Sequence, residues 1–357
     1  MARENVWDRL WFKIFAASML FFLCQLFLTF AKVQTFEEDK MYLKAEVESL
    51  ERKKDTLNMD IMTKQRTLAR MNKEESRLEN LLRDRVNLLP SGRKTDPVIY
   101  FVTPTNFRTG QKADLTRLSY TLSHVPNLFW IVVEDSSSKS NTVAEIIRRS
   151  HLPYAHMNVE TPKEKKMKYS DPNWYLPRGV DQRNAALSWL RTQLISAKQG
   201  VVYFGDDDNT YDLRLFEELR SIKKAGIVPV GIVGGLIVEA PTLASNGSVV
   251  GFNAVWKPER PFPIDMAAFA VNLTLITQNP SAGFKYDVPR GYQESQFLTS
   301  LGVKRWELEP KAQKCTKVYV WHTRTEKAKL SKTDIERVGN HKTADFESLE
   351  AEALGLE

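Results

Sequence analysis

The sequence predicts an α/β protein with a mainly parallel sheet, placed behind an N-terminal transmembrane helix and a helical stalk. After residue 97, short β-branched or aromatic runs alternate with segments of helical spacing, and the runs end in turn or acidic residues. An uncharged apolar stretch near the N-terminus indicates the transmembrane helix. The 357 residues allow one large domain or two small ones, and either is long enough to bury a core.

The composition excludes several classes of protein. Hydrophobic residues make up 42% of the chain, which is too many for a chain that is disordered throughout. The sequence has two cysteines, Cys24 in the apolar stretch and Cys315 in the folded part, so we expect neither a disulfide-stapled scaffold nor a bridge between them. The net charge of +7 indicates an anionic partner, but it does not separate nucleic acid from a membrane surface or a phosphorylated substrate.

The apolar stretch covers residues 14–31, IFAASMLFFLCQLFLTFA, between Lys13 and Lys32. Its length is about what the hydrocarbon core of a bilayer requires. The aromatic end LFLTF is a poor cleavage site, so we expect an uncleaved signal anchor rather than a removed signal peptide. Basic residues flank both sides, and the charges therefore give no orientation. Because a long C-terminal domain behind such an anchor usually crosses the membrane, we expect residues 1–13 in the cytosol.

Residues 32–96 are predicted to form a stalk. Apolar residues recur there on an alternating four-three spacing, which favours a coiled coil, although four core positions are charged and a lone charged helix is the alternative. The apolar positions are Leu43, Val47, Leu50, Leu57, Ile61, Leu68, Met71, Leu78, Leu82 and Leu89, and the charged ones are Lys54, Lys64, Glu75 and Arg85. The sequence LPSG at 89–92 predicts the end of the helix and a linker.

Four strands are predicted in the globular part, at residues 97–105, 128–135, 200–208 and 228–235, with helices at 182–197 and 213–224. Strands that alternate with helices form a parallel sheet with both faces covered, and ligands bind at the carboxyl ends of its strands. The first three strands end in Thr103-Pro-Thr, Glu134-Asp135 and Asp206-Asp-Asp208, so polar chemistry is expected at that edge. Beyond residue 236 the pattern is irregular and indicates a second half, followed at 341–357 by an acidic, solvated tail.

The run Asp206-Asp207-Asp208 is costly at the end of an apolar strand unless a cation neutralises it. Alternate side chains point the same way, so Asp206 and Asp208 are expected to face one site and Asp207 another. Three interpretations compete: a glycosyltransferase D-x-D motif, a phosphatase D-x-D-x-T motif completed by Thr210, and a plain acidic surface turn. The phosphatase nucleophile normally lies on the first strand of its domain, whereas at least two strands precede this one.

Nine strings occur in order between residues 97 and 329: VTPT, VEDS, PRGVDQRNAAL, GVVYFGDDDNTY, VGIVGGL, VGFNAVW, RPFPIDMAAFAV, PRGYQES and VWHTRTEK. In these strings the chain resembles the β-1,3-glucuronyltransferases, which add glucuronic acid to galactose-terminated glycans. The resemblance implies a GT-A-like α/β fold, with a Rossmann-type nucleotide-sugar-binding half at 97–235 and an acceptor-binding half at 236–340. It also implies Mn²⁺ as cofactor, a homodimer, and a single-pass type II protein of the Golgi membrane with a lumenal catalytic domain. Nucleic acid is then not expected as a partner.

By the same resemblance, one group of residues binds UDP-glucuronic acid, with Asp208 as the metal ligand. This group is Pro104, Thr105, Asn106, Asp135, Arg178, Arg183, Asp206, Asp207, Asp208, His322, Thr323 and Arg324. Arginine suits both phosphate and the planar carboxylate of glucuronic acid. The chain departs from the family at Asn106, where the family has a tyrosine that stacks on uracil, and Phe107 is the adjacent aromatic residue.

Glu294 matches the family's catalytic base, which takes the proton of the acceptor hydroxyl in a single inverting displacement. From the residues alone it is equally a helix-start glutamate. The galactose acceptor is expected to contact Glu239, Trp256, Arg260 and Asp265. These residues do not separate the galactosyl-galactosyl-xylosyl linker of proteoglycans from N-acetyllactosamine ends, and a lectin-like relative without turnover is a further alternative. The sequons Asn246-Gly-Ser and Asn272-Leu-Thr predict glycosylation at Asn246 and Asn272.

Overall fold

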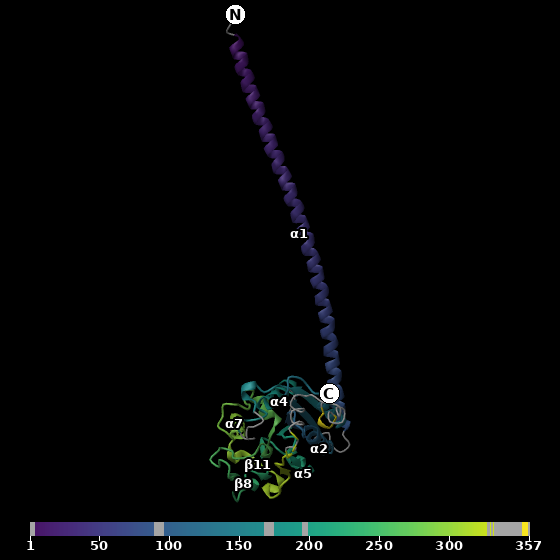
Figure 1. Cartoon of the computed structure of the whole chain (residues 1–357), viewed down its shortest axis with the longest axis vertical. Coiled ribbons are helices and arrows are strands. Elements are labelled where there is room, and N and C mark those ends of the chain that lie inside the picture. Colours follow the sequence, from purple (N-terminus) through teal and green to yellow (C-terminus); the bar gives the residue numbers. More distant parts are fainter. Residues whose placement is uncertain are drawn as a thin grey trace. The chain divides into compact units, whose positions relative to one another are not determined.

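The computed structural model describes residues 4–88, 96–167, 175–194, 199–326, 329, 331 and 352–355. The chain divides into two compact units, Met1–Leu81 and Leu82–Glu357. Figure 1 shows the long first helix and the α/β unit with its labelled elements. The predicted linker at 89–92 lies outside the described residues, and of the acidic tail only residues 352–355 are described.

The first helix, α1 (Glu4–Leu88), is continuous through the predicted anchor and stalk. Its segment Arg9–Lys32 has a mean hydropathy of 2.1 and is long and apolar enough to cross a membrane. The expected N-terminal apolar helix is therefore confirmed. Within the stalk, Leu50 and Leu57 are exposed in the single chain, as one side of a coiled-coil seam would be. The pairing of two stalks stays a prediction.

A seven-stranded sheet forms the centre of the second unit, in the order β11-β6-β10-β4-β1-β2-β3. Strands β4, β1, β2 and β3 are parallel to one another, whereas β10 runs antiparallel to both of its neighbours, β4 and β6. The strands are β1 (Ile99–Thr105), β2 (Leu128–Glu134), β3 (Tyr154–Asn158), β4 (Val201–Phe204), β6 (Ala225–Ile227), β10 (Phe269–Asn272) and β11 (Leu308–Pro310). The predicted α/β class is confirmed.

A smaller five-stranded sheet has the order β5-β12-β7-β8-β9. Its strands are β5 (Thr210–Tyr211), β7 (Val230–Val233), β8 (Leu236–Leu243), β9 (Val249–Asn253) and β12 (Val320–Trp321). The helices are α2 (Gln111–Ser123), α3 (Asn141–Arg149), α4 (Val180–Gln193), α5 (Leu213–Arg220), α6 (Leu273–Gln278), α7 (Gln293–Ser300) and α8 (Ala312–Cys315), with short 3₁₀ turns η1 (Lys163–Lys165), η2 (Met266–Ala268) and η3 (Arg305–Glu307).

One predicted strand belongs to a different sheet from the other three. The segment 97–105 contains β1, 128–135 contains β2 and 200–208 contains β4, all in the large sheet, but β7 from the segment 228–235 lies in the small one. The chain leaves the large sheet after β6 and then makes the β7–β8 hairpin, which turns at Gly234 and Gly235 with φ of +63° and +85°. The small sheet is therefore built largely from the acceptor-side half of the sequence.

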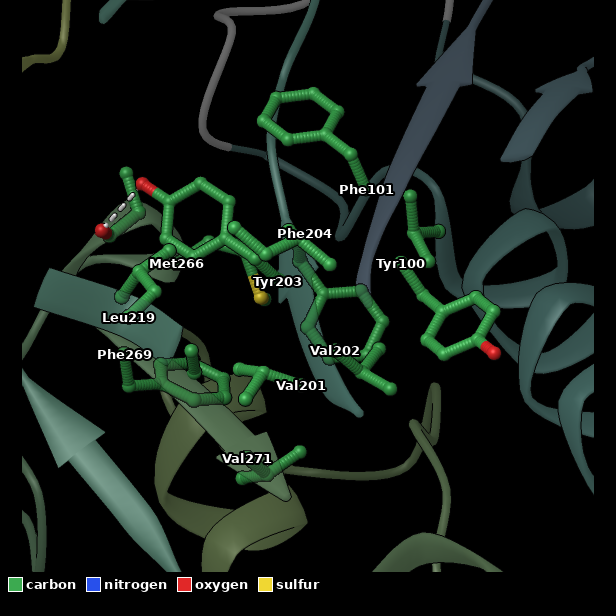
Figure 2. Packing of buried hydrophobic residues seen from close by; sticks show 14 of the residues in the cluster. Tyr100, Phe101, Val201, Val202, Tyr203, Phe204, Leu219, Met266, Phe269 and Val271 are labelled. Carbon is green, nitrogen blue, oxygen red and sulfur yellow. Dashed lines mark hydrogen bonds between the residues drawn. The ribbon is translucent and has the colours of Figure 1, made fainter. Parts of the chain in front are cut away.

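Aromatic side chains from β1, β4 and β10 fill the core beside the central strand (Figure 2). Tyr203 is fully buried and donates its hydroxyl hydrogen to the carbonyl of Ala267 at 2.7 Å, so its one polar atom is satisfied. Where β4 ends, the ring of Phe101 packs so closely on Gly205 that a Cβ at that position would collide with it. Glycine therefore lets the chain pass from the core directly into the acidic run.

Candidate active site

The acidic run begins one residue after β4, at the carboxyl edge of the parallel strands where ligands are expected. Its three carboxylates have different surroundings. Asp206 Oδ1 accepts a hydrogen bond from Arg183 Nη2 at 2.8 Å. Asp207 is buried and points to the loop after β1, where it contacts Thr105 and Arg108. The predicted divergence of Asp207 from its neighbour is therefore present in the structure.

Asp208 has a carboxylate for which no hydrogen bond is found among the described residues. Burial, followed by the neighbouring charges of Asp207 and Asp206, raises the pKa of Asp208 to about 6. Among the described residues no cation forms an ion pair with this carboxylate, although the charge of Arg108 acts on it. An acidic oxygen donor of this kind suits a hard divalent ion. Among the described residues, no group of three or more His, Cys, Asp or Glu side chains forms a metal cage. Asp208 would therefore hold a cation only together with further oxygen donors.

The backbone at Gly179 lies close to the side chains of Arg183 and of Pro104 in β1. Gly179 has a φ of +70°, and a Cβ there would lie 2.6 Å from Arg183 Nη1 and 3.2 Å from the Cβ of Pro104. Arg183 also donates to the carbonyl of Arg178 at 2.8 Å, and its buried Nε has no hydrogen-bond partner among the described residues. The side chain of Arg178 is exposed. One guanidinium is thus anchored at Asp206 and keeps a donor for a ligand.

The segment after β12 contacts the acidic run. Thr323 Oγ1 donates to the carbonyl of Asp208 at 2.6 Å and lies 3.0 Å from Thr210 Oγ1. His322 Nδ1 lies 3.1 Å from Asp265 Oδ2, and the hydrogen bond with this carboxylate raises the pKa of His322. Arg324 lies next to the other ring nitrogen, with Nε and Nη2 both 3.4 Å from His322 Nε2. These contacts collect the three predicted C-terminal donor residues at the same edge.

Asp135 lies at the end of β2, beside the end of β1. Its backbone N–H donates to the carbonyl of Thr105 at 2.7 Å, and its carboxylate accepts from the N–H and hydroxyl of Thr161 at 2.7 and 2.8 Å. Asn106 is exposed next to it, and Phe107 is 39% exposed. The position where the resemblance places a nucleobase is thus bordered by an oriented carboxylate and an accessible aromatic ring.

Glu294 lies in the first turn of α7, as the helix-start interpretation expects. Its carboxylate is 15% exposed and lies 3.8 Å from the guanidinium of Arg260. Burial is the largest influence on Glu294; with the charge of Asp265 it outweighs the lowering effects of Arg260 and Arg183, and raises the pKa to about 7. A carboxyl group that ionises near neutral pH is suited to accept a proton.

Two of the four predicted acceptor residues, Arg260 and Asp265, act on the Glu294 carboxylate through their charges. Burial and then the charge of Asp265 raise the pKa of Glu239 on β8 to about 7. Burial alone would raise the pKa of Asp265, but its hydrogen bond to His322 outweighs this and holds the pKa below its usual range. The guanidinium of Arg260 donates to the carbonyls of Lys257, Gly291 and Trp256. Trp256 is 39% exposed, and the guanidinium of Arg290 lies 4.6 Å from its ring centre.

The two predicted glycosylation sites differ in their surroundings. Asn246 is exposed in the β8–β9 turn, where its Oδ1 accepts from the N–H and hydroxyl of Ser248. Asn272 caps α6 by accepting from the N–H of Thr274 at 3.0 Å, and its Nδ2 donates to the carbonyl of Ile222 at 3.3 Å. The amide nitrogen of Asn272 is therefore used inside the fold, whereas Asn246 presents its side chain to solvent.

Four residues that contact Asp207 or its hydrogen-bond partners were not predicted from the sequence. Arg108 donates to Asp207, and Gln111 donates to Thr105. Asp114 accepts from Arg108 and from Thr325. Arg108, Gln111 and Asp114 share one signal, a polar, charged stretch directly after the strand that ends in VTPT, whereas Thr325 lies in the string VWHTRTEK. That signal marks a loop, but it does not say which carboxylate a distant arginine meets.

Comparison with known proteins identifies the family. A sequence profile of glycosyltransferase family 43 matches residues 118–326, which include the acidic run, Glu294 and His322. The relative galactosylgalactosylxylosylprotein 3-beta-glucuronosyltransferase sqv-8 of Caenorhabditis elegans is 57% identical over 357 residues, all of both chains. This chain belongs to glycosyltransferase family 43. The phosphatase interpretation of the D-x-D-x-T string loses its support.

Two human relatives match a shorter part of the chain. Galactosylgalactosylxylosylprotein 3-beta-glucuronosyltransferase 1 is 52% identical over 244 residues, 68% of this chain and 73% of its own length. The human enzyme 3 of the same name is 48% identical over 254 residues, 68% of this chain and 75% of its own length. Residues 1–349 of S. aureus TarS superpose on 72% of this chain with a TM-score of 0.40 and 14% identity, too loosely to support a functional conclusion.

Proposed function

We propose that this family 43 glycosyltransferase is an inverting β-1,3-glucuronosyltransferase that transfers glucuronic acid from UDP-glucuronic acid to the 3-hydroxyl of a terminal galactose. The observation that supports the proposal most is the Glu294 carboxyl group, whose pKa is raised to about 7. The charges of Arg260, Asp265 and Arg183 act on this group. The names of the relatives supply the class of donor and acceptor. Because all three names carry the galactosylgalactosylxylosyl unit, we take this linker as the preferred acceptor.

In the proposed reaction, Glu294 takes the proton of the acceptor 3-hydroxyl. The freed oxygen attacks the anomeric carbon from the face opposite the diphosphate, and the bond between that carbon and the β-phosphate oxygen breaks. The electron pair leaves with UDP. One displacement of this kind inverts the α-linked donor sugar to a β-linked product, and it needs a single base.

The other residues of the site bind and orient the two substrates. Arg183 presents a guanidinium donor to the diphosphate or the uronate, and Asp206 fixes its direction. Asp207 and Asp135 are assigned to the ribose and the uracil. His322, its charged form favoured by Asp265, is placed against the donor's negative charge. On the acceptor side, the exposed face of Trp256 stacks on the apolar face of galactose, while Glu239 and Asp265 accept hydrogen bonds from its hydroxyls.

Asp208 would hold a divalent cation, which we assign as Mn²⁺. When bound, this ion neutralises charge on the diphosphate leaving group. The fit rests on the Asp208 carboxylate, which has no protein donor on it within the described residues, and on the high cost of three adjacent carboxylates without a cation.

We further propose a type II arrangement in the Golgi membrane, with the segment Arg9–Lys32 as a signal anchor and the catalytic unit in the lumen. The accessible sequon at Asn246 is compatible with a lumenal location. A homodimer is proposed from the apolar seam of the stalk, where Leu50, Leu57 and Leu68 are exposed in one chain.

The test is a transfer assay with the purified full chain, UDP-glucuronic acid and Mn²⁺. Two acceptors are compared, galactosyl-galactosyl-xyloside and N-acetyllactosamine. We expect UDP release that depends on the acceptor, with a product carrying a β-1,3-linked glucuronic acid on the first acceptor in preference to the second. Transfer from UDP-glucose but not from UDP-glucuronic acid would overturn the donor assignment. Binding of both substrates without turnover would support the lectin-like alternative.

A further inference from the structure

The central carboxylate of the acidic run is held from outside the run by a forked arginine. Arg108 follows β1 in the loop that leads to α2. Its Nη1 donates to Asp207 Oδ2 at 2.9 Å, and its Nη2 donates to Asp207 Oδ1 at 2.7 Å. Thr105 Oγ1 donates to Oδ2 at 2.7 Å. The plane of the Asp207 carboxylate is therefore fixed by three hydrogen bonds, two of them from one rigid guanidinium.

Among the described residues, the hydrogen bonds of Asp207 leave one acceptor position of its carboxylate without a partner. Each oxygen of a carboxylate accepts about two hydrogen bonds. Oδ2 already accepts two, from Thr105 and Arg108, whereas Oδ1 accepts one, from Arg108. The remaining lone pair on Oδ1 is directed by the fork. A hydroxyl that binds there meets an acceptor already oriented before the ligand arrives, so that little ordering is left to do on binding.

Arg108 is in turn held by a second buried carboxylate. Its Nη2 donates to Asp114 Oδ2 at 2.6 Å, and Asp114, on α2, is only 1% exposed. The other oxygen of Asp114 accepts from Arg117 and from the hydroxyl of Thr325 in the segment after β12. An arginine between two buried carboxylates has little rotational freedom. The same Asp114 ties the loop after β1 to the segment that carries His322 and Thr323.

We propose that Arg108, oriented by Asp114, is a positioning residue that fixes Asp207 for a hydroxyl of the nucleotide sugar and so sets the affinity for the donor. The inference rests on the proposed function, in which Asp207 contacts the donor. Arg108 acts through Asp207 and not on the reacting atoms, and the chemical step therefore depends on it much less than donor binding does.

The alternative is a merely structural ion pair, and the proposal differs from it in what each variant changes. Arg108→Gln removes the fork; because a hydrogen bond to a charged group is lost, the donor KM is expected to rise about tenfold, with kcat within about threefold of the wild type. Arg108→Lys keeps the charge without the fork and is expected to behave like Arg108→Gln rather than to restore the wild-type KM. A structural role predicts a lower melting temperature with no selective change in donor KM.

A double-mutant cycle tests whether Asp114 acts through Arg108. Asp114→Asn alone is expected to raise the donor KM severalfold, and the double variant Arg108→Gln/Asp114→Asn to raise it no further than Arg108→Gln does. Arg108→Gln takes one of two arginine partners from the buried Asp114 carboxylate and leaves Arg117 as the other. The double variant removes this weakened charge, so it is the form to measure if the single variant does not fold. The matched control is Arg117→Gln: Arg117 touches Asp114 but not Asp207, and its side chain is 65% exposed. Its donor KM is expected within about twofold of wild type.

The experiment measures initial rates against UDP-glucuronic acid at saturating acceptor, UDP binding by calorimetry with Mn²⁺, and melting temperature for each variant of the full chain. Unchanged donor KM and unchanged UDP affinity in Arg108→Gln would overturn the proposal, as would additive effects of the two substitutions or full rescue by lysine. If the wild type neither transfers glucuronic acid nor binds UDP, the proposed function fails. If the wild type does both and Arg108→Gln matches it, the function stands and the positioning role falls.

Discussion

The carboxylate of Glu294 and the guanidinium of Arg260 lie 3.8 Å apart, too far for a hydrogen bond but close enough for an ion pair. The guanidinium of Arg260 donates its hydrogen bonds to backbone carbonyls, including those of Trp256 and Gly291. It therefore supplies positive charge to Glu294 without capturing its lone pairs. Burial prevails over this charge and raises the pKa of Glu294 to about 7, which leaves a carboxylate whose oxygens are available to a substrate hydroxyl.

Glu294→Gln should abolish transfer and preserve donor binding. The amide has the same shape, but it cannot accept the proton of the attacking hydroxyl, so we expect kcat to fall by about 10²–10⁴-fold. UDP affinity in the presence of Mn²⁺ should stay within about twofold, because in the described part of the chain Glu294 makes no hydrogen bond or ion pair with a predicted donor residue and acts on Arg183 only through its charge. Rate assays and calorimetry on the same preparation check both statements. Transfer near the wild-type rate would contradict the assignment of the base.

The pH dependence of transfer should follow the same carboxyl group. Glu294 must be ionised to act as a base, so kcat is expected to rise with pH through about 7 and then to level off. Glu239, whose pKa is also raised to about 7, contributes to acceptor binding instead. At saturating acceptor Glu239→Gln should therefore keep the rise. A flat profile between pH 5 and 8 in the wild type would contradict this prediction.

The same shift predicts an effect on stability with a definite sign. The folded protein binds the Glu294 proton more tightly than the unfolded chain does, so ionisation costs stability as pH rises from 4.5, the ordinary pKa of a glutamate, to about 7, and the cost is constant above that. Glu294→Gln removes this cost, which is on the order of 3 kcal/mol. Its melting temperature should exceed the wild-type value at pH 8 and approach it at pH 4. Thermal unfolding at the two pH values measures the difference.

Asp208→Asn should abolish the metal-dependent part of UDP binding. An amide oxygen is a much weaker ligand for a divalent cation than a carboxylate, and the diphosphate then binds without its counter-charge. Calorimetry with Mn²⁺ and with a chelator should give the same low affinity in the variant and different affinities in the wild type. Asp212→Asn is the matched control. Asp212 caps α5 nearby, and asparagine caps a helix about as well as aspartate.

Trp256→Ala should raise the acceptor KM about tenfold or more and leave the donor KM unchanged, because stacking on a sugar face is lost. Trp306 in η3 is the matched control, since it is 68% exposed and contributes to none of the assigned contacts. Kinetics at saturating donor with the galactosyl-galactosyl-xyloside acceptor separate the two variants. An equal effect of both substitutions would place the acceptor elsewhere.

The sequence was sufficient for the large parallel strands and for the acidic run, because each is a local pattern. The runs that became β1, β2 and β4 are strongly apolar and end in polar residues. It was insufficient for β3, whose sequence YAHMN carries no β-branched residue, and for β10, which joins the sheet antiparallel between β4 and β6. Long-range pairing decides such strands, and a single sequence does not display it.

The candidate site divides in the same way. The resemblance pointed to Glu294, to the acidic run and to the donor residues at 322–324, all of which lie in distinctive strings. It did not supply Arg108 or Asp114. Arg108 contacts Asp207 from 99 positions away in the sequence, and Asp114 joins this network through Arg108. No spacing rule connects Arg108 with Asp207. A buried ionic network depends on the tertiary fold in a way that a surface motif does not.

The turn between β7 and β8 offers a last, internally controlled test of the acceptor site. Gly234 and Gly235 both have positive φ, so alanine at either position costs about 1 kcal/mol of backbone strain. They differ in their neighbours: a Cβ at Gly234 would collide with the carboxylate of Glu239, whereas a Cβ at Gly235 meets nothing within 4 Å. Gly234→Ala should therefore displace Glu239 and raise the acceptor KM, while Gly235→Ala should lower the melting temperature by a similar amount and leave that KM unchanged. Acceptor kinetics and thermal unfolding of the two variants, measured together, isolate the contribution of Glu239 from that of the strained turn. If both variants raise the acceptor KM equally, turn strain and not Glu239 controls acceptor binding.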